Sequence, residues 1–384
     1  METNTGSAPI TKYLMAKAVR QKLPLSGCFE LSPLCNMDCR MCYVRMSRAE
    51  QEAIAPLRTA QEWLQLGKEA RDQGMLYLLL TGGEVFLRKD FREIYEGLHQ
   101  MGIILEINSN GTLIDEETVA WLSAMPPQRI NITLYGASDA TYERLCRNPK
   151  GFTQVTRAIR LLKEAGIMVR LNCSVTPYNK EDLEEIFAFG KREELPVRAV
   201  SYMYPPVRRD ASSVGTNDRF LPEEAAYYDA KIKAYSLDKE KFLEWSEKVD
   251  EMQFPELSED ACREHGADGV RCHAGRSSFW INWSGEMVPC GMFRGDEKYN
   301  VFREGFTENW KRVLEETNKI RLASACGGCA QKEICKSCAA MEITENGRFG
   351  QVPEYRCQMV KAMPEAIKKV RSEVLREGSV SLDE

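Results

Sequence analysis

The sequence predicts an α/β fold in which parallel strands alternate with helices and a cysteine-rich region follows. Six short apolar runs alternate with longer amphipathic runs between residues 28 and 203. This alternation is typical of parallel strands joined by right-handed crossovers. Eight of the fourteen cysteines lie between Cys262 and Cys357. Periodicity alone leaves a partial barrel and a doubly wound sheet both open. In either fold, ligands bind at the carboxyl ends of the strands.

The predicted strands are short apolar runs, and the predicted helices are the amphipathic segments between them. We expect strands at Cys28–Ser32, Met75–Thr81, Ile103–Asn108, Arg129–Tyr135, Met168–Val175 and Val197–Met203. We expect helices at Thr59–Gln73, Asp90–Met101, Asp115–Ala124, Phe152–Ala165 and Lys180–Arg192. Thr59 and Asp115 are of the residue types that cap helix amino ends, and glycines follow three of the helices.

Breaks in this pattern divide the chain into five expected segments. Residues 202–222 interrupt the periodicity with Pro, Gly, Ser and Asn, which indicates a linker. Glu223–Glu251 then reads as a helix, and Trp280–Cys290 as a β-hairpin that turns at Ser284–Gly285. The expected segments are a lead-in (1–26), the strand–helix units (27–205), a linker with a bridging helix (206–260), the cysteine-rich domain (261–360) and a C-terminal helix and tail (361–384).

Composition narrows the compartment and the partners. The 384 residues carry a net charge of −5, so there is no basic footprint for nucleic acid. The amino-terminal residues lack the apolar core of a signal peptide, and the longest apolar run, Met75–Leu80, is too short to span a bilayer. We therefore expect a soluble, cytoplasmic protein without a membrane partner. In a reducing compartment, cysteines are more often metal ligands than disulfides.

Three cysteines follow the first predicted strand as Cys35-x3-Cys39-x2-Cys42, here called the Cys loop (residues 35–42). Three thiolates at this spacing can hold three corners of a cubic iron–sulfur cluster and leave the fourth iron open to a small molecule. A zinc site is the alternative, but it needs a fourth ligand. The nearest candidates, His99 and Cys146, are distant in sequence. The spacing favours a reactive iron–sulfur cluster.

Other special residues end the next three strands. The second strand runs into Thr81-Gly82-Gly83-Glu84, where two glycines allow close backbone approach to a ligand and the carboxylate can bind an ammonium group. The third ends in Asn108-Ser109-Asn110-Gly111-Thr112 and the fourth in Thr133-Leu134-Tyr135-Gly136. Because the carboxyl ends of parallel strands meet at one edge, we expect these segments to lie beside the Cys loop.

The Cys loop and the Gly-Gly-Glu segment resemble those of the radical S-adenosylmethionine (SAM) enzymes. The resemblance implies a six-unit partial barrel and a SAM-binding 4Fe–4S cluster held by the three cysteines. It also implies a set of SAM-binding residues: Gly82, Gly83, Glu84, Asn110, Thr133 and Arg144. One departure is that Met41 stands before the third cysteine, where these enzymes usually carry an aromatic residue.

The C-terminal cysteines resemble the SPASM extension of radical SAM enzymes. A zinc ribbon would space its two cysteine pairs by 15–20 residues, whereas five separate Cys329 from Cys335 here. The resemblance implies two auxiliary 4Fe–4S clusters, three in all. The first set is Cys262, Cys272, Cys290 and Cys338, and the second is Cys326, Cys329, Cys335 and Cys357. Cys28, Cys146 and Cys173 stand apart and are expected to be buried thiols.

By resemblance, the expected activity is cleavage of SAM to a 5′-deoxyadenosyl radical that abstracts hydrogen from a peptide or protein. The products would be an oxidation, a crosslink or a thioether, as in ribosomal peptide maturation, with flavodoxin or ferredoxin as electron donor. The alternatives are a SPASM enzyme acting on a small metabolite such as a sugar or alcohol, an anaerobic sulfatase maturase, and a non-catalytic electron carrier. Gly291 after Cys290 disfavours the sulfatase reading, because those enzymes carry Asp there.

Substrate contacts are expected from the linker at the mouth of the barrel. The candidates are Tyr202, Tyr204 and Arg208, because loops beside a barrel commonly carry function. The barrel pattern begins by residue 28, so we expect no separate leader-peptide-binding domain ahead of it.

Overall fold

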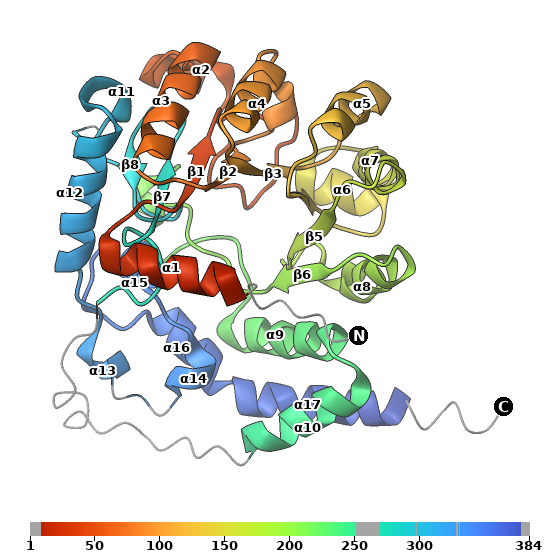
Figure 1. The fold of residues 1–384 in the computed structure, drawn as a ribbon. Coiled ribbons are helices and arrows are strands. Elements are labelled where there is room, and N and C mark those ends of the chain that lie inside the picture. The colour runs from red at the N-terminus through yellow and green to blue at the C-terminus, as the bar shows by residue number, and fades with distance from the viewer. Residues whose placement is uncertain (1–8, 251–268, 297, 328, 330, 378–384) are drawn as a thin grey trace.

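The structure is a computed structural model that describes residues 9–250, 269–296, 298–327, 329 and 331–377. Its centre is a sheet in the order β6-β5-β4-β3-β2-β1-β7-β8, curved into a partial barrel (Figure 1). The six barrel strands are parallel neighbours. They are β1 (Ser26–Glu30), β2 (Tyr77–Thr81), β3 (Ile104–Ser109), β4 (Arg129–Thr133), β5 (Val169–Ser174) and β6 (Val197–Val200). The predicted partial barrel is confirmed.

Helices that follow the strands cover the outer face of this sheet (Figure 1). They are α3 (Ala60–Asp72), α4 (Phe91–Gln100), α5 (Glu116–Ala124), α7 (Gly151–Glu164) and α8 (Leu183–Arg192), the last preceded by the 3-10 turn η2 (Lys180–Asp182). Their bounds agree closely with the predicted ones because the predicted caps act: Thr59 accepts from the N–H of Glu62, and Asp115 from that of Thr118. Three further helices are α1 (Pro9–Gln21), α2 (Arg48–Ile54) and α6 (Asp139–Cys146).

Burial alternates along the barrel strands, so each strand has two different faces. On β3 and β5, Leu105, Ile107 and Leu171 are at most 1% exposed and pack in the core under the helices. Glu106 and Asn108, the neighbours of the β3 pair, are less buried and point to the opposite side. The outer face therefore makes the hydrophobic core, and the inner face lines the barrel with polar side chains.

The predicted hairpin is present and extends the barrel sheet. Strands β7 (Ser278–Ile281) and β8 (Met287–Val288) pair antiparallel, with Gly285 at φ +101° in the turn between them. β7 also pairs in parallel with β1, from Ser26 opposite Ser278 to Phe29 opposite Ile281. The cysteine-rich region is thus joined to the barrel through backbone hydrogen bonds.

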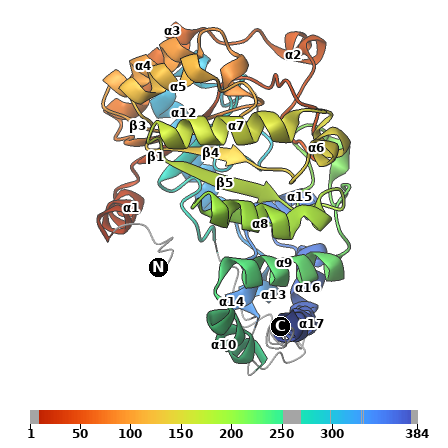
Figure 2. The ribbon, with the colours of Figure 1, turned by 90° about the vertical axis from the view of Figure 1, so that its right-hand side faces the viewer.

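The remaining helices cover the two ends of the open sheet. The segment predicted as one helix over Glu223–Glu251 forms two, α9 (Pro222–Ser236) and α10 (Lys239–Asp250). Helix α9 contacts β6, and α16 (Glu354–Lys361) and α17 (Met363–Glu377) stack on α9 (Figure 2). At the other end, α12 (Phe306–Lys319), preceded by α11 (Val301–Glu304), contacts β8 and α3. Such covers remove the exposed edges that would otherwise pair with other chains.

Three short helices lie among the later cysteines: α13 (Ser324–Gly327) contains Cys326, α14 (Lys332–Cys335) ends at Cys335, and α15 (Ala339–Asn346) follows Cys338. Within the described ranges, no helix has the length and apolarity needed to cross a bilayer.

Candidate functional site

The Cys loop is a tight, backbone-anchored turn at the carboxyl end of β1. The N–H groups of Asp38 and Arg40 donate to the carbonyls of Cys146 and Leu145 at 3.0 and 3.1 Å, which ties the loop to α6. The N–H of Met37 donates to Cys35 Sγ at 3.4 Å, and that of Arg45 to Cys42 Sγ at 3.2 Å. These contacts fix the loop and direct N–H groups at its sulfur atoms.

The loop thiols lie in a largely buried environment that disfavours free thiolates. Burial raises the pKa of Cys35 to about 12, with the nearby Cys39 and Cys42 acting in the same direction. A hydrogen bond with the thiol of Cys146, followed by burial, raises the pKa of Cys39. Deprotonation therefore requires a bound cation, because a coordinated metal stabilises thiolates.

The arrangement of these donors suits a cluster better than a single ion. Within the described part of the chain, no three His, Cys, Asp or Glu side chains are arranged to hold one metal ion. In a cubane, each thiolate binds a different iron, so the three sulfur atoms stand further apart than the ligands of one ion. The three thiols of the Cys loop therefore fit the 4Fe–4S cluster that their spacing predicts.

The Gly-Gly-Glu segment lies directly against the backbone that leads into the Cys loop. The N–H of Gly83 donates to the carbonyl of Ser32 at 2.7 Å, and that of Glu84 to Leu34 at 2.9 Å. A Cβ on Gly82 would lie 2.4 Å from the Ser32 carbonyl oxygen, and one on Gly83 would lie 2.3 Å from that of Leu34. Both glycines are therefore needed so that two stretches of backbone can meet, a reason that the sequence analysis did not anticipate.

Glu84 is 1% exposed and accepts three hydrogen bonds. Its Oε1 accepts from the N–H of Phe86 and the hydroxyl of Ser109, and its Oε2 from the N–H of Asn110 at 2.7 Å. Burial raises the pKa of Glu84 to about 7, although these hydrogen bonds oppose the shift. A carboxylate has about four acceptor positions. One position on Oε2 therefore remains for a ligand donor, and an ammonium there would favour the ionised form.

The other predicted SAM residues divide into two groups. Asn110 donates through Nδ2 to Cys35 Sγ at 3.6 Å and to Asn36 at 2.9 Å, so it joins Glu84 to the Cys loop. Thr133 ends β4. The guanidinium of Arg144 instead donates to the carbonyl of Tyr178 at 3.0 and 2.7 Å, which ties α6 to the segment after β5. Their roles toward SAM stay predictions.

Four C-terminal cysteines line one cavity. Its volume is about 450 Å³, and the thiols are those of Cys326, Cys329, Cys335 and Cys357, the set expected for the second auxiliary cluster. Arg271, Lys332, Arg356 and Lys361 also line it. Cationic side chains favour thiolates and an anionic cluster, so the donor set and its surroundings fit the group.

The first auxiliary set is brought together as far as the structure describes it. Burial raises the pKa of Cys290, and the nearby Cys338 and Cys272 add to that shift. Cys272 and Cys290 also line a second cavity of about 510 Å³, walled by residues of β1, β2, β3 and β7. Cys262, the fourth predicted ligand, lies outside the described residues. This cavity connects the expected cluster position with the barrel strands.

Of the predicted substrate contacts, Arg208 lies in a buried ion pair. Its Nη2 donates to both carboxylate oxygens of Glu30 at 2.9 Å, and its Nη1 donates to the carbonyl of Gly291 at 2.8 Å. Glu30 is 0% exposed and also accepts from Trp280 Nε1 at 3.2 Å. Arg208 therefore joins the end of β1 to the hairpin.

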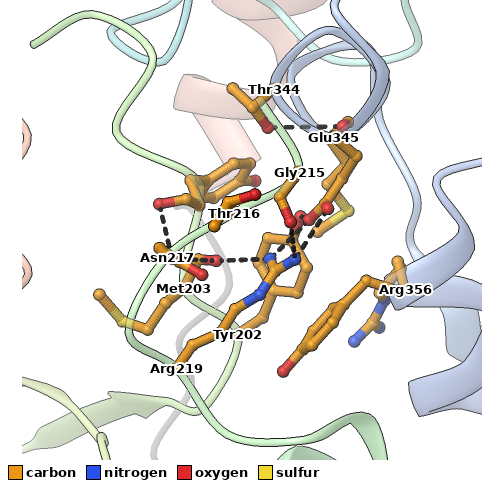
Figure 3. Close-up of polar contacts among 12 residues, drawn as sticks. Tyr202, Met203, Gly215, Thr216, Asn217, Arg219, Thr344, Glu345 and Arg356 are labelled. Atoms are coloured by element: carbon orange, nitrogen blue, oxygen red, sulfur yellow. Dashed lines mark hydrogen bonds and ion pairs between the residues drawn. The ribbon is translucent and has the colours of Figure 1, made fainter. Parts of the chain in front are cut away.

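Tyr202 and Tyr204 also contact the cysteine-rich region. Tyr202 donates its hydroxyl to Glu345, which accepts two further bonds from Arg219 at 2.6 and 2.8 Å (Figure 3). The guanidinium of Arg219 lies 3.5 Å from the ring centre of Tyr355. Tyr204 Oη lies 3.7 Å from Cys338 Sγ. These contacts engage both hydroxyls. A role of the two tyrosines in substrate binding stays a prediction.

Several residues of this region make contacts that their sequence context did not predict. Glu30 carries a charge inside an apolar strand, which is a detectable signal of a buried pair. Tyr135 is partly buried beside the thiols of the Cys loop; desolvation raises its pKa, and the neighbouring thiols raise it further. No local pattern pointed to Arg219 or Glu345.

A partial barrel with three thiols at the end of its first strand, beside a Gly-Gly-Glu segment, defines the radical SAM type of enzyme. The model of the radical SAM superfamily matches residues 29–190. The chain therefore carries a radical SAM domain and is an enzyme whose cofactors include SAM and a 4Fe–4S cluster.

Two curated relatives resemble most of the chain. The AdoMet-dependent heme synthase of Methanosarcina barkeri is 25% identical over 85% of this chain and 94% of its own length. The antilisterial bacteriocin subtilosin biosynthesis protein AlbA of Bacillus subtilis is 24% identical over 81% of this chain and 68% of its own length.

Two solved structures share the fold. SuiB of Streptococcus suis, bound to the precursor peptide SuiA, has a TM-score of 0.63 at 16% identity, covering 92% of this chain and 83% of SuiB. The protein anSMEcpe with bound AdoMet has a TM-score of 0.62 at 18% identity, covering 92% of this chain and 96% of its own.

Proposed function

We propose that this chain is a radical SAM/SPASM oxidoreductase that abstracts a hydrogen atom from a peptide or protein and oxidises the resulting radical. The observation that carries the proposal is the cavity shared by Cys272, Cys290 and the barrel strands. A cluster held there would lie next to the barrel interior, where the substrate is expected, and could accept its electron. The structural likeness to SuiB with its precursor peptide supports a peptide substrate.

Each group of site residues would have a separate role. The Cys loop would hold the SAM-binding cluster, and the two C-terminal sets would hold two auxiliary clusters. When bound, these groups deliver one electron that cleaves SAM to methionine and a 5′-deoxyadenosyl radical, and they accept the electron that the oxidised substrate gives up. Glu84 would hold the SAM ammonium, Thr133 the ribose, and the buried Cys loop would exclude water.

The overall balance is a loss of two hydrogens from the substrate. One hydrogen leaves as the abstracted atom, and the other leaves as a proton and an electron. An external flavodoxin or ferredoxin would supply the electron that starts the cycle. A cytoplasmic location fits, because a reducing compartment keeps the thiols available.

The structure gives a reason why sulfatase maturation is the weaker alternative. Position 291, where sulfatase-maturating enzymes carry Asp, is a glycine whose added Cβ would lie 2.8 Å from the indole ring of Trp280. The carbonyl of Gly291 also accepts from Arg208. A larger side chain cannot occupy this position without moving the hairpin.

A small-molecule substrate is the second candidate function. The heme synthase relative, similar over 85% of this chain, favours it. The non-catalytic electron carrier is not retained as an alternative, because the radical SAM domain over residues 29–190 makes this chain an enzyme.

The experiment is anaerobic reconstitution with iron, sulfide and SAM, followed by mass spectrometry of products. Candidate precursor peptides and iron-containing porphyrins are incubated separately, and 5′-deoxyadenosine is quantified in both. A peptide that loses about 2 Da per 5′-deoxyadenosine supports the proposal. Turnover of the porphyrin alone would reject the peptide reading, and absence of 5′-deoxyadenosine would reject the catalytic one.

A further inference from the structure

The inner face of the barrel carries a ladder of polar residues that SAM and the cysteines leave unused. Strand register places Glu106 beside Arg129, Asn131 beside Arg170, and Asn172 beside Arg198. Directly paired residues of a sheet point to the same side, so the three arginines share the inner face with Glu106. The hydrogen bond from Asn131 to Asn108, at 2.9 Å, follows the same face across β3 and β4.

Only one of these arginines has an anionic partner. Arg129 donates to both carboxylate oxygens of Glu106 at 2.7 Å, so this pair is neutral overall. Arg170 and Arg198 form no hydrogen bond or ion pair with any described residue. Two uncompensated positive charges therefore remain on this face of β5 and β6, of which Arg170 is partly buried and Arg198 is exposed.

Two buried atoms beside these charges have no partner. They are Arg170 Nε and the side-chain oxygen of Asn172, both inaccessible and without a hydrogen bond. Partial burial lowers the pKa of Arg170. The positive charges of Arg129 and Arg198 lower this pKa further, and together they outweigh the negative charge of Glu106, which raises it. Of the two unpartnered atoms, one is a donor and the other an acceptor. Buried polar atoms without partners are costly in a folded protein, which is the pattern expected when a ligand completes the site.

The position of the arginines suits a substrate better than SAM. Arg170 stands four residues before the end of β5, about 13 Å along the strand at roughly 3.3 Å per residue. The SAM residues stand at the opposite edge, where Glu84 and Asn110 follow the strand ends. Arg198 lies in the same row as Thr133, two strands away, or about 10 Å across the sheet. The charges thus lie below and beside the expected ribose.

We propose that Arg170 and Arg198 bind a carboxylate of the substrate on the inner face of the barrel sheet, while the side-chain oxygen of Asn172 accepts a hydrogen bond from an N–H or O–H of the same substrate. Guanidinium groups suit this role because they bind carboxylates in a planar, two-point geometry. This inference rests on the proposed function, since it assumes a substrate in the barrel. It adds that the substrate carries an acidic group that reaches into the barrel, away from the SAM edge.

The test compares acidic and neutral probes on the reconstituted protein with SAM, by anaerobic calorimetry. The probes are the peptides Ac-Gly-Glu-Gly-Glu-Gly-NH2 and Ac-Gly-Gln-Gly-Gln-Gly-NH2, and the small tricarboxylate tricarballylate. The variants are the double change Arg170→Gln with Arg198→Gln, and Arg348→Gln as a control that removes an exposed arginine after α15. SAM affinity and thermal unfolding of each protein show whether the fold is kept.

We expect wild type and the control to bind an acidic probe at least about tenfold more tightly than the neutral peptide, and the double variant to lose that preference. Binding of the Glu peptide would assign the carboxylate to an acidic peptide, and binding of tricarballylate alone to a metabolite. Equal affinity for acidic and neutral probes, or a preference that survives in the double variant, would overturn the inference. Turnover of a neutral peptide with no charge preference would reject this inference and leave the proposed function standing.

Discussion

Replacing Glu84 with glutamine removes the buried carboxylate of the Gly-Gly-Glu segment. This carboxylate accepts a hydrogen bond from Asn110, which also contacts Cys35 of the Cys loop. The remaining acceptor position on Oε2 suits the ammonium of SAM, and a hydrogen bond to a charged group contributes about 1.5–3 kcal/mol. We therefore expect Glu84→Gln to weaken SAM binding by roughly 10- to 150-fold. Iron content should be unchanged, because Glu84 donates nothing to the cysteines.

The pKa of Glu84 gives this prediction a second signature. Its carboxyl has a pKa of about 7 instead of 4.5, mainly because of burial, so the folded protein holds the proton more tightly than the unfolded chain. Burial of the ionised group therefore costs stability increasingly as pH rises from about 4.5 to about 7. SAM binds the ionised form, so wild-type affinity should fall by roughly tenfold per pH unit below 7. Glu84→Gln should lack this dependence.

The assay is anaerobic calorimetry of SAM binding between pH 6 and 8, with iron analysis and thermal unfolding. Glu342→Gln is the matched control: Glu342 is also 1% exposed, accepts the N–H groups of Ala323 and Gly350, and has a pKa raised by burial. It lies in α15, away from the Cys loop. SAM affinity equal to wild type in Glu84→Gln, at every pH, would remove Glu84 from the SAM site.

Three further predictions concern the clusters and their support. Changing all three cysteines of the Cys loop to alanine should abolish 5′-deoxyadenosine formation, measured by chromatography after reduction, and any remaining product would contradict the central assignment. Gly83→Ala should lower stability by about 1–3 kcal/mol and weaken SAM binding, because the new Cβ would meet the Leu34 carbonyl. Gly102→Ala, strained by its φ of +78° but with no neighbour within 4 Å of its Cβ, should lower stability too and leave SAM affinity intact. Cys262→Ala should alter the auxiliary signal in Mössbauer and EPR spectra, and an unchanged signal would show that Cys262 is not a ligand.

The parts of the fold that were predicted from sequence depend on local signals. Thr59 and Asp115 cap their helices as their residue types indicate, and short apolar runs between amphipathic segments identified the barrel strands. The four thiols that line one cavity had also been grouped from their spacing and their resemblance to the SPASM extension. Caps, periodicity and motif spacing act within a few residues, so one sequence suffices to detect them.

Contacts between distant segments could not be predicted in this way. β7 pairs with β1 across some 250 residues, and Arg219 reaches Glu345 across 126. In the sequence, Arg219 and Glu345 look like ordinary solvated side chains, and only folding brings them together. The same holds for the hydrogen bond from the Tyr202 hydroxyl to Glu345, which joins residues 143 apart in the chain.

The inner-face arginines lie between these two cases. β4 and β5 alternate polar and apolar residues with a period of two, as in Arg129, Asn131 and Thr133, or Arg170, Asn172 and Ser174. That alternation is visible in the sequence and indicates a polar barrel interior. Which arginine has a partner is not visible, because the pairing with Glu106 depends on strand register.

The buried carboxylate of Glu30 has a consequence for electron transfer. It ends β1 five residues before Cys35, and it binds Arg208, which also holds the carbonyl of Gly291 next to Cys290. Removing one partner of a buried ion pair costs about 3–5 kcal/mol, so this connection does not open easily. The SAM site and the first auxiliary set are thus held at a fixed separation by one short chain of contacts. Under the proposed function, a substrate between them would lose its hydrogen atom on one side and its electron on the other without any domain movement.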